Sequence, residues 1–269
     1  MKNIEVPEVT FQFFKTAALE QKSSGEWRMH PFEVIAWLRE GDAVLEYLNP
    51  ALGKIRRKKD SVIRVAANET RHSVILSGKM VSSVAGFSFE TRDGFNFLDH
   101  FSLPSELPEN IQGKLRKALT HLETIENTPM DFLRKQILRT ETGYSILSAL
   151  LDAAEEKNFE PVRASGIESA ARYLNRHFRE PCDLRKIIQE SGLSRAVFFR
   201  LFHRRFSCTP MEYLSRLRLR TAVAFLLNTT MNISEIGAAS GWSDPYHFSR
   251  IFRMMTGVPP SEYRKNPER

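Results

Sequence analysis

Arginine side chains recur in two segments near the end of the sequence, at spacings that place them on one side of a helix. The first segment carries Arg195, Arg200 and Arg204, and the second carries Arg250 and Arg253. A planar guanidinium group can donate two parallel hydrogen bonds to a phosphate or to the edge of a guanine base. These segments therefore predict contacts with a polyanion, and nucleic acid presents both of those groups.

The distribution of charge along the chain supports this prediction. The formal net charge is +7 at pH 7. Residues 1–162 contain 21 Lys and Arg against 23 Asp and Glu, whereas residues 163–269 contain 18 against 9, and all but two of these 18 cations are arginine. Because the positive excess lies in the C-terminal part, we expect that part to bind nucleic acid.

An internal repeat runs through the same part of the chain. Each copy reads as a helix, a glycine turn and a second helix, over residues 183–206 and 232–255. Thr209 and Asn232, each followed three residues later by a glutamate, are capping signals, and Thr209 opens a long connecting helix over residues 210–228. The repeat is the helix-turn-helix pattern, present twice. Six residues recur 50 positions later: Phe198, Arg200, Phe202, Pro210, Glu212 and Tyr213 correspond to Phe248, Arg250, Phe252, Pro260, Glu262 and Tyr263.

The second helix of each copy has an apolar side and a cationic side. Phe198 and Phe202 in the first copy, and Phe248 and Phe252 in the second, fall on the side expected to be buried. The major groove of B-DNA is about 12 Å wide and admits one α-helix, so the opposite side is available for duplex DNA. The residues expected from this face to contact DNA are Arg195, Ala196, Phe199, Arg200, His203, Arg204, Tyr246, His247, Ser249, Arg250 and Arg253.

The C-terminal sequence resembles the AraC/XylS family of bacterial transcription regulators. The resemblance covers residues 166–265 and is carried by GLSRAVFFRLFHRRF and GWSDPYHFSRIFRMMTGVPPSEYRK. It implies two helix-turn-helix subdomains that insert recognition helices into successive major-groove faces of promoter DNA. It also adds Pro245 to the residues expected to contact DNA. Ser207 stands where the family usually has glycine. Ala196 and Phe199 are apolar where polar base readers are common, which indicates contacts with thymine methyl groups.

The N-terminal part reads as a β domain followed by helices. Residues 27–101 contain short runs rich in β-branched and aromatic residues, separated by turn signals, which favours a sandwich or small barrel. The basic run at residues 54–59 is expected to be a solvated loop. After Pro108 apolar residues return at helical spacing, and a second helix is predicted to begin at Thr128 and Pro129. These helices either pack on the β domain or pair with a second subunit.

Many members of the resembled family carry an N-terminal cupin-like β-barrel that binds a small effector, followed by helices that dimerise. Residues 58–73 resemble the strand-turn-strand segment of such barrels that ends in a histidine. The resemblance therefore implies a small-molecule effector, such as a sugar or another metabolite, and a homodimer. The residues expected to contact the effector are Trp27, His30, Trp37 and His72.

The sequence shows little sign of a metal site, a catalytic nucleophile or a disulfide. The histidines of the N-terminal part are isolated, without the His-x-His cluster of metal-dependent cupin enzymes, so no metal and no cofactor is expected. Neither a nucleophile elbow nor a phosphate-binding glycine loop occurs. Cys182 and Cys208 have no partners at disulfide or zinc spacing, and we expect them to be buried. An enzyme is therefore not expected. Two alternatives stay open: a fused cupin enzyme, and a regulator whose N-terminal domain only dimerises or binds a partner protein.

A membrane partner is not expected either. No apolar run approaches the ~20 residues that a membrane-spanning helix needs. The first residues interrupt their apolar positions with Glu5, Pro7 and Glu8, which does not fit a secretory signal. A cytoplasmic location is therefore expected.

The expected fold is α+β with two domains. Residues 1–105 are predicted to form the cupin-like β-barrel and residues 106–155 a helical dimerisation segment. Residues 156–165 are the expected linker, and residues 166–269 the all-α DNA-binding domain. The predicted function is sequence-specific regulation of bacterial transcription, as an activator gated by a small molecule. Contact with RNA polymerase is left open as a further partner.

Overall fold

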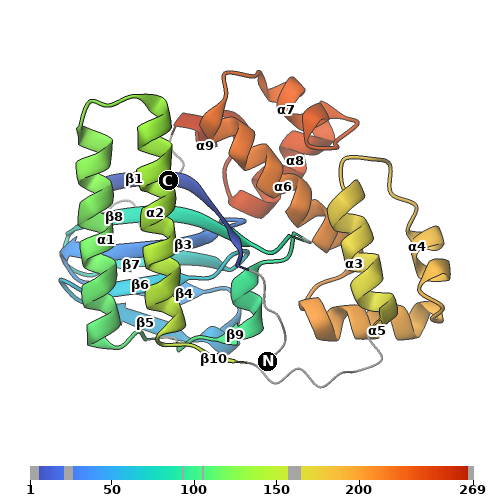
Figure 1. The fold of residues 1–269 in the computed structure, drawn as a ribbon, viewed down its shortest axis with the longest axis horizontal. Coiled ribbons are helices and arrows are strands. Elements are labelled where there is room, and N and C mark those ends of the chain that lie inside the picture. The colour runs from blue at the N-terminus through green and yellow to red at the C-terminus, as the bar shows by residue number, and fades with distance from the viewer. Residues whose placement is uncertain (1–5, 21–26, 93, 105, 157–164, 266–269) are drawn as a thin grey trace.

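The computed structural model describes residues 6–20, 27–92, 94–104, 106–156 and 165–265, and these form two domains (Figure 1). The N-terminal domain contains two four-stranded sheets and two long helices, and the C-terminal domain is helical. The expected α+β architecture, with a β-barrel followed by an all-α domain, is confirmed. None of the helices in the described ranges is both long and apolar enough to cross a membrane.

The two large sheets are antiparallel and share an apolar interior. The first has the order β1-β8-β3-β6, and the second has the order β2-β7-β4-β5. A short third sheet pairs β9 with β10, and 3-10 turns lie at Pro50–Leu52 and Phe97–His100. The strands are β1 (Glu8–Glu20), β2 (Arg28–Met29), β3 (Glu33–Glu40), β4 (Ala43–Tyr47), β5 (Lys54–Arg57), β6 (Val62–Val65), β7 (Thr70–Ile75), β8 (Lys79–Glu90), β9 (Phe101–Ser102) and β10 (Glu155–Glu156).

Strand β3 is buried on both of its faces. Val34 and Ala36 point toward the second sheet, whereas Ile35 and Trp37 pack against the helices on the other side. A strand with apolar neighbours on both sides needs apolar residues at every position rather than at alternate ones. This explains the continuous apolar run in its sequence.

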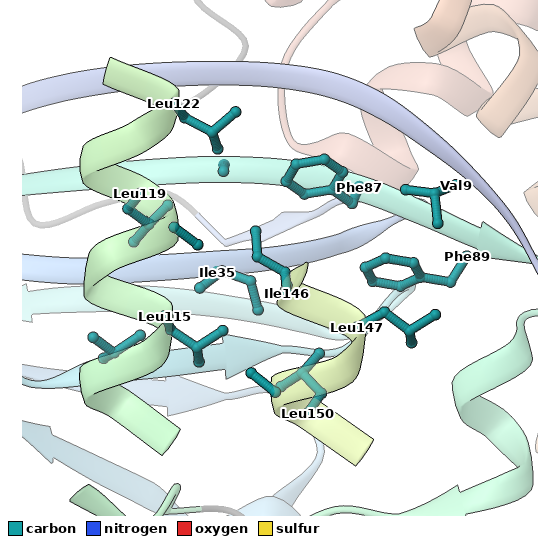
Figure 2. Packing of buried hydrophobic residues seen from close by; sticks show 14 of the residues in the cluster. Val9, Ile35, Phe87, Phe89, Leu115, Leu119, Leu122, Ile146, Leu147 and Leu150 are labelled. Atoms are coloured by element: carbon teal, nitrogen blue, oxygen red, sulfur yellow. The ribbon is translucent and has the colours of Figure 1, made fainter. Parts of the chain in front are cut away.

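Helices α1 (Glu109–Asn127) and α2 (Phe132–Leu151) cover the outer face of the first sheet (Figure 1). Figure 2 shows Leu119 from α1 and Leu147 from α2 pointing toward the side chains of the sheet, among them Phe87. Full burial of a leucine side chain contributes about 1.5–3 kcal/mol, so this layer holds both helices on the barrel. The sequence left open whether these helices pack on the β domain or pair with a second subunit. In the structure they pack on the β domain.

The C-terminal domain contains seven helices within the described residues. The first helix-turn-helix unit has its own apolar core, which includes Phe198 and Phe202. The core of the second unit, with Phe252 and Tyr263, is continuous with the barrel interior around Phe13. The second unit is thus packed against the N-terminal domain. The helices are α3 (Ser165–His177), α4 (Leu184–Glu190), α5 (Arg195–Phe206), α6 (Pro210–Asn228), α7 (Ile233–Ala239), α8 (Pro245–Thr256) and α9 (Pro260–Lys265).

Several local predictions for the N-terminal domain were wrong. Most of the basic run at residues 54–59 is not a loop, because Lys54–Arg57 forms β5 with Ile55 and Arg57 buried. The aromatic residues at Phe97–His100 form a 3-10 turn rather than a strand. Strand β1 was missed altogether.

The boundaries of the helical segment also differ from the prediction. Thr128 ends α1, and α2 begins after Asp131, whose carboxylate accepts a hydrogen bond from the backbone N–H of Arg134 at 2.8 Å. Glu155 and Glu156 form β10, where the helical segment was expected to end and the linker to begin. Residues 157–164 of the expected linker lie outside the described residues.

Candidate nucleic-acid interface and effector cavity

The first candidate recognition helix is α5, which begins after Ser194. The turn before it places Gly192 at a φ of 68°, a conformation that glycine adopts without steric cost. Phe198 and Phe202 are fully buried, because they pack against α3 and α6. The burial of one side of α5 leaves the side with Arg195 and Arg200 exposed.

The second candidate recognition helix is α8, and its two ends are capped by its own residues. The Asp244 carboxylate accepts a hydrogen bond from the backbone N–H of Tyr246 at 2.9 Å, and Pro245 occupies the first helical position. Gly257 ends the helix in the left-handed conformation. Phe248 and Phe252 are fully buried, whereas Tyr246 is 88% exposed.

Helix α6 connects the two helix-turn-helix units. Its start is the predicted capping box: the Thr209 hydroxyl accepts from the backbone N–H of Glu212, and the Glu212 carboxylate accepts from the backbone N–H of Thr209 at 2.7 Å. Leu214 and Leu217 belong to the core of the first unit, and Leu219 belongs to that of the second. Helix α6 therefore fixes the separation of α5 and α8.

Most of the residues predicted to contact DNA are on the surface. Phe199 and Ser249 are partly buried, and Phe199 packs against the core of the first unit with the Arg195 guanidinium 5.7 Å from the centre of its ring. Only part of the Phe199 ring is therefore available for a thymine methyl group. The exposed members are Arg195, Ala196, Arg200, His203, Arg204, Pro245, Tyr246, His247, Arg250 and Arg253.

Arg204 also lies at the boundary between the two domains. It lines a cleft of about 560 Å³ between the two domains, together with Glu69 and Arg216. Across the same cleft, Phe206 at the end of α5 stacks on Phe95 with ring centres 6.1 Å apart. The C-terminal end of α5 therefore contacts the N-terminal domain, whereas its N-terminal end does not line this cleft.

The arginines of the C-terminal domain fall into two groups. Arg218 donates to the backbone carbonyls of Phe178 and Glu180, and Arg220 pairs with Glu90 at 3.2 Å. By contrast, no carboxylate among the described residues forms an ion pair with the exposed arginines of α5 and α8 that were predicted to contact DNA. These are Arg195, Arg200, Arg204, Arg250 and Arg253. Their positive charge is therefore available for an external partner.

A small cavity lies inside the barrel, between the two sheets. Its volume is about 90 Å³, and His30 is the one effector candidate that lines it. The His30 ring is 4% exposed, and its Nδ1 lies 2.7 Å from the Tyr263 hydroxyl of α9. Burial, helped by the charges of Arg71 and Arg28, holds the pKa of His30 well below its usual value. The ring is therefore neutral at physiological pH.

The other three effector candidates lie elsewhere. Trp27 and His72 pack together with ring centres 4.2 Å apart, and His72 hydrogen-bonds to the Glu46 carboxylate at 3.0 Å. Trp37 is on the opposite face of β3 from the cavity, against the helical layer, with the Arg39 guanidinium over its ring. The four candidates therefore do not form one site.

Comparison with known proteins identifies the C-terminal domain. Residues 187–266 match a family described as a helix-turn-helix domain. The Msm operon regulatory protein of Streptococcus mutans is 24% identical over 159 residues, which is 57% of each chain. The arabinose operon regulatory protein of Salmonella typhimurium is 27% identical over 117 residues, which is 43% of this chain and 42% of that protein. In its C-terminal domain the chain is similar to the AraC/XylS family of regulators. It spans about half the length of these two relatives.

The whole chain also has a structural relative. ToxT from Vibrio cholerae aligns with a TM-score of 0.59 at 13% identity, covering 94% of this chain and 98% of that one. The likeness at this identity concerns the fold, and it extends over both domains. One ToxT structure is described as bound to an unsaturated fatty acid.

The AraC/XylS sequence pattern singles out Ser207 but gives no indication of the two arginines in the barrel. Ser207, at the position where the family usually has glycine, has a φ of 54° and ends α5 in the left-handed conformation. The sequence prediction missed Arg57 and Arg71, which line the barrel cavity. The signal for Arg57 was present, because Ile55 and Arg57 alternate with polar neighbours as one buried face of a strand does.

Proposed function

We propose that this protein is a sequence-specific transcription regulator of the AraC/XylS family that binds promoter DNA through α5 and α8. The observation that carries the proposal is the set of exposed arginines on these two helices that have no carboxylate partner among the described residues. Helix α6 holds the two helices at a fixed separation. Such side chains can donate to phosphates and to guanine edges in the major groove. The regulator acts in the cytoplasm, on chromosomal DNA.

The two recognition helices have different roles in this proposal. The exposed face of α8 combines Arg250 with polar neighbours such as Tyr246, which suits hydrogen bonding to bases. The exposed face of α5 places Ala196 and part of Phe199 beside Arg200. That surface suits a phosphate contact with thymine methyl groups next to it.

The N-terminal barrel is proposed to bind the small molecule that controls DNA binding. Its interior core is continuous with the core of the second helix-turn-helix unit, so a change inside the barrel reaches α8 without an intervening flexible segment. That ToxT shares this fold and has been solved with a fatty acid supports a ligand-binding role. We propose activation of transcription, by contact with RNA polymerase at the promoter, as the outcome.

A homodimer through α2 is a second proposal, and a specific observation favours it. Phe132, Leu133 and Ile137 are 75%, 69% and 58% exposed at the start of α2, although all three are large and apolar. Exposed apolar patches often mark protein interfaces. Sedimentation of the full chain should show a dimer that Ile137→Asp weakens, and a monomeric wild-type protein would contradict this proposal alone.

The experiment for the main proposal is selection of genomic fragments by the full chain, followed by affinity measurements on the selected duplex. A protein that neutralises 6–10 phosphates loses about 10³–10⁵ in affinity between 50 and 200 mM salt. We expect a selected motif and a steep salt dependence. Failure to select any duplex, or an affinity that is flat with salt, would overturn DNA binding. Metal content and turnover assays on the same protein address the alternative of a fused enzyme.

A further inference from the structure

The barrel cavity is built from hydrogen-bond donors in an apolar shell. Val34, Leu45 and other apolar side chains from the two sheets form most of its wall. The polar groups that line it are Arg57, Arg71, His30, Ser73 and Ser82. Among the residues that the structure describes, neither Asp nor Glu lines the wall. A site inside the protein with charged donors and no acidic side chain has no counter-ion of its own.

Some of these polar groups lack a hydrogen-bond partner among the described residues. Arg57 is 3% exposed, and its Nε has no hydrogen-bond partner among the described residues. One terminal nitrogen of Arg57 donates to the Ala36 carbonyl at a long 3.4 Å, and one of Arg71 donates to the Arg28 carbonyl at 3.2 Å. The Ser82 hydroxyl is also buried without a partner in the described part of the chain. The Arg57 and Ser82 side chains can therefore donate further hydrogen bonds into the cavity.

Neither arginine has a counter-ion in the described residues. No ion pair joins Arg57 or Arg71 to a carboxylate, although nearby Arg64 is paired with Glu33 at 2.8 Å. Burial lowers the pKa of Arg57 and of Arg71 to about 10, so both stay protonated at neutral pH. An unpaired buried charge is costly in free energy. Arg57 is buried and Arg71 is half-buried. Two such cations beside one cavity, without a carboxylate partner among the described residues, indicate that an external anion supplies the missing charge.

We propose that this cavity binds a small organic carboxylate, held by Arg57 and Arg71 with Ser82 as a further donor. The proposal deepens the proposed function, since it names the chemical class of the effector. A guanidinium group can bind a carboxylate through two parallel hydrogen bonds. Pockets for drug-sized ligands measure about 300–1,000 Å³, whereas this cavity measures about 90 Å³. The ligand is therefore compact, such as acetate or propionate.

A contact between the domains links the cavity to the DNA-binding helices. His30 lines the cavity and is also bonded to the Tyr263 hydroxyl at 2.7 Å. The Tyr263 ring packs edge-on against Phe252 of α8, with ring centres 5.4 Å apart. An anion in the cavity is thus separated from the second recognition helix by two side chains. Its binding changes the affinity of the protein for DNA through this contact.

The test is calorimetric titration of the full chain, without DNA, with acetate and propionate and with their uncharged amides. Carboxylate binding with at least about tenfold preference over the amide is expected, because charge-assisted bonds are lost in the amide. Arg57→Met and Arg71→Met should each abolish the preference. Arg56→Met is the matched control, since Arg56 lies on the same strand but is exposed and paired with Asp42. It should bind the carboxylate like the wild type.

Several outcomes would overturn the proposal. Equal affinity for acid and amide, tighter binding of inorganic phosphate than of any carboxylate, or unchanged carboxylate binding in both Met variants would each do so. Because an unpaired buried charge is removed, apo Arg57→Met should melt no lower than the wild type. A marked loss of melting temperature in both Met variants would make the arginines structural and contradict the site. DNA binding is measured separately, so its failure would refute the proposed function rather than this inference.

Discussion

The Nδ1 atom of His30 and the hydroxyl of Tyr263 lie 2.7 Å apart, although 233 positions of sequence separate the two residues. Both side chains are buried, with exposed fractions of 4% and 1%. His30 follows the short strand β2 of the barrel, and Tyr263 lies in α9 of the DNA-binding domain. This polar contact lies within the apolar core that the domains share. It therefore gives the domain interface a specific geometry that apolar packing alone does not impose.

A double-mutant cycle tests this contact. His30→Phe and Tyr263→Phe each leave a buried polar group without its partner, so each should lower the free energy of unfolding by about 1–3 kcal/mol. The pair should show a coupling of about 1 kcal/mol in urea denaturation. His30→Phe combined with Tyr213→Phe, which removes a hydrogen bond to Asn175, is the control and should be additive. If the losses of stability in His30→Phe and Tyr263→Phe are also additive, the contact between these two side chains contributes no stability.

Stability should fall in mild acid because of His30. Its pKa in the folded protein is below the ordinary value of 6.5, so below about pH 6.5 the unfolded chain binds a proton that the folded chain does not. The contribution of His30 to stability is therefore intact above that pH and is lost as the pH falls, by at most about 1.4 kcal/mol per pH unit. Denaturation of the wild type and of His30→Phe between about pH 7 and 5 measures this difference.

The two arginines at equivalent repeat positions should differ in what they recognise. Arg250→Ala should weaken binding by about 1–3 kcal/mol and relax the preference at one base pair, as expected for a contact to guanine. Arg200→Ala should weaken all sequences nearly alike, as expected for a phosphate contact. Binding selections with each variant measure both effects. Arg134→Ala, an exposed arginine on α2, removes the same charge away from α5 and α8. If Arg200→Ala and Arg250→Ala both select DNA with the affinity and sequence preference of the wild type, the DNA-binding surface lies elsewhere on the protein.

Ser207 is expected to carry strain. A non-glycine residue with a φ of 54° is disfavoured by about 1–2 kcal/mol, partly offset by the greater freedom of glycine in the unfolded chain. Ser207→Gly should therefore raise the free energy of unfolding by about 0.5 kcal/mol in urea denaturation. Ser215→Gly, within helix α6, should lower it by a similar amount. If Ser207→Gly is instead destabilising, the serine side chain stabilises the end of α5.

The helix-turn-helix units could be predicted in detail because their signals are local. The capping boxes at Thr209 and Asn232 join residues three positions apart, and the buried phenylalanines follow one helical period. The barrel was predicted only as a class of fold. The burial of Arg57 depends on the opposite sheet, which distant residues supply, so the sequence alone predicts a loop for this basic run. The proximity of His30 to Tyr263 likewise depends on how the domains pack.

The most direct test of the central claim is a footprint of the full chain on its selected duplex. Recognition helices on one rigid connector should protect two motifs about one helical turn, roughly 34 Å, apart on the same face of the DNA. Inserting about half a turn between the motifs should then abolish simultaneous protection. Protection of one short motif only, or indifference to the insertion, would contradict the claim that α5 and α8 read the same site together.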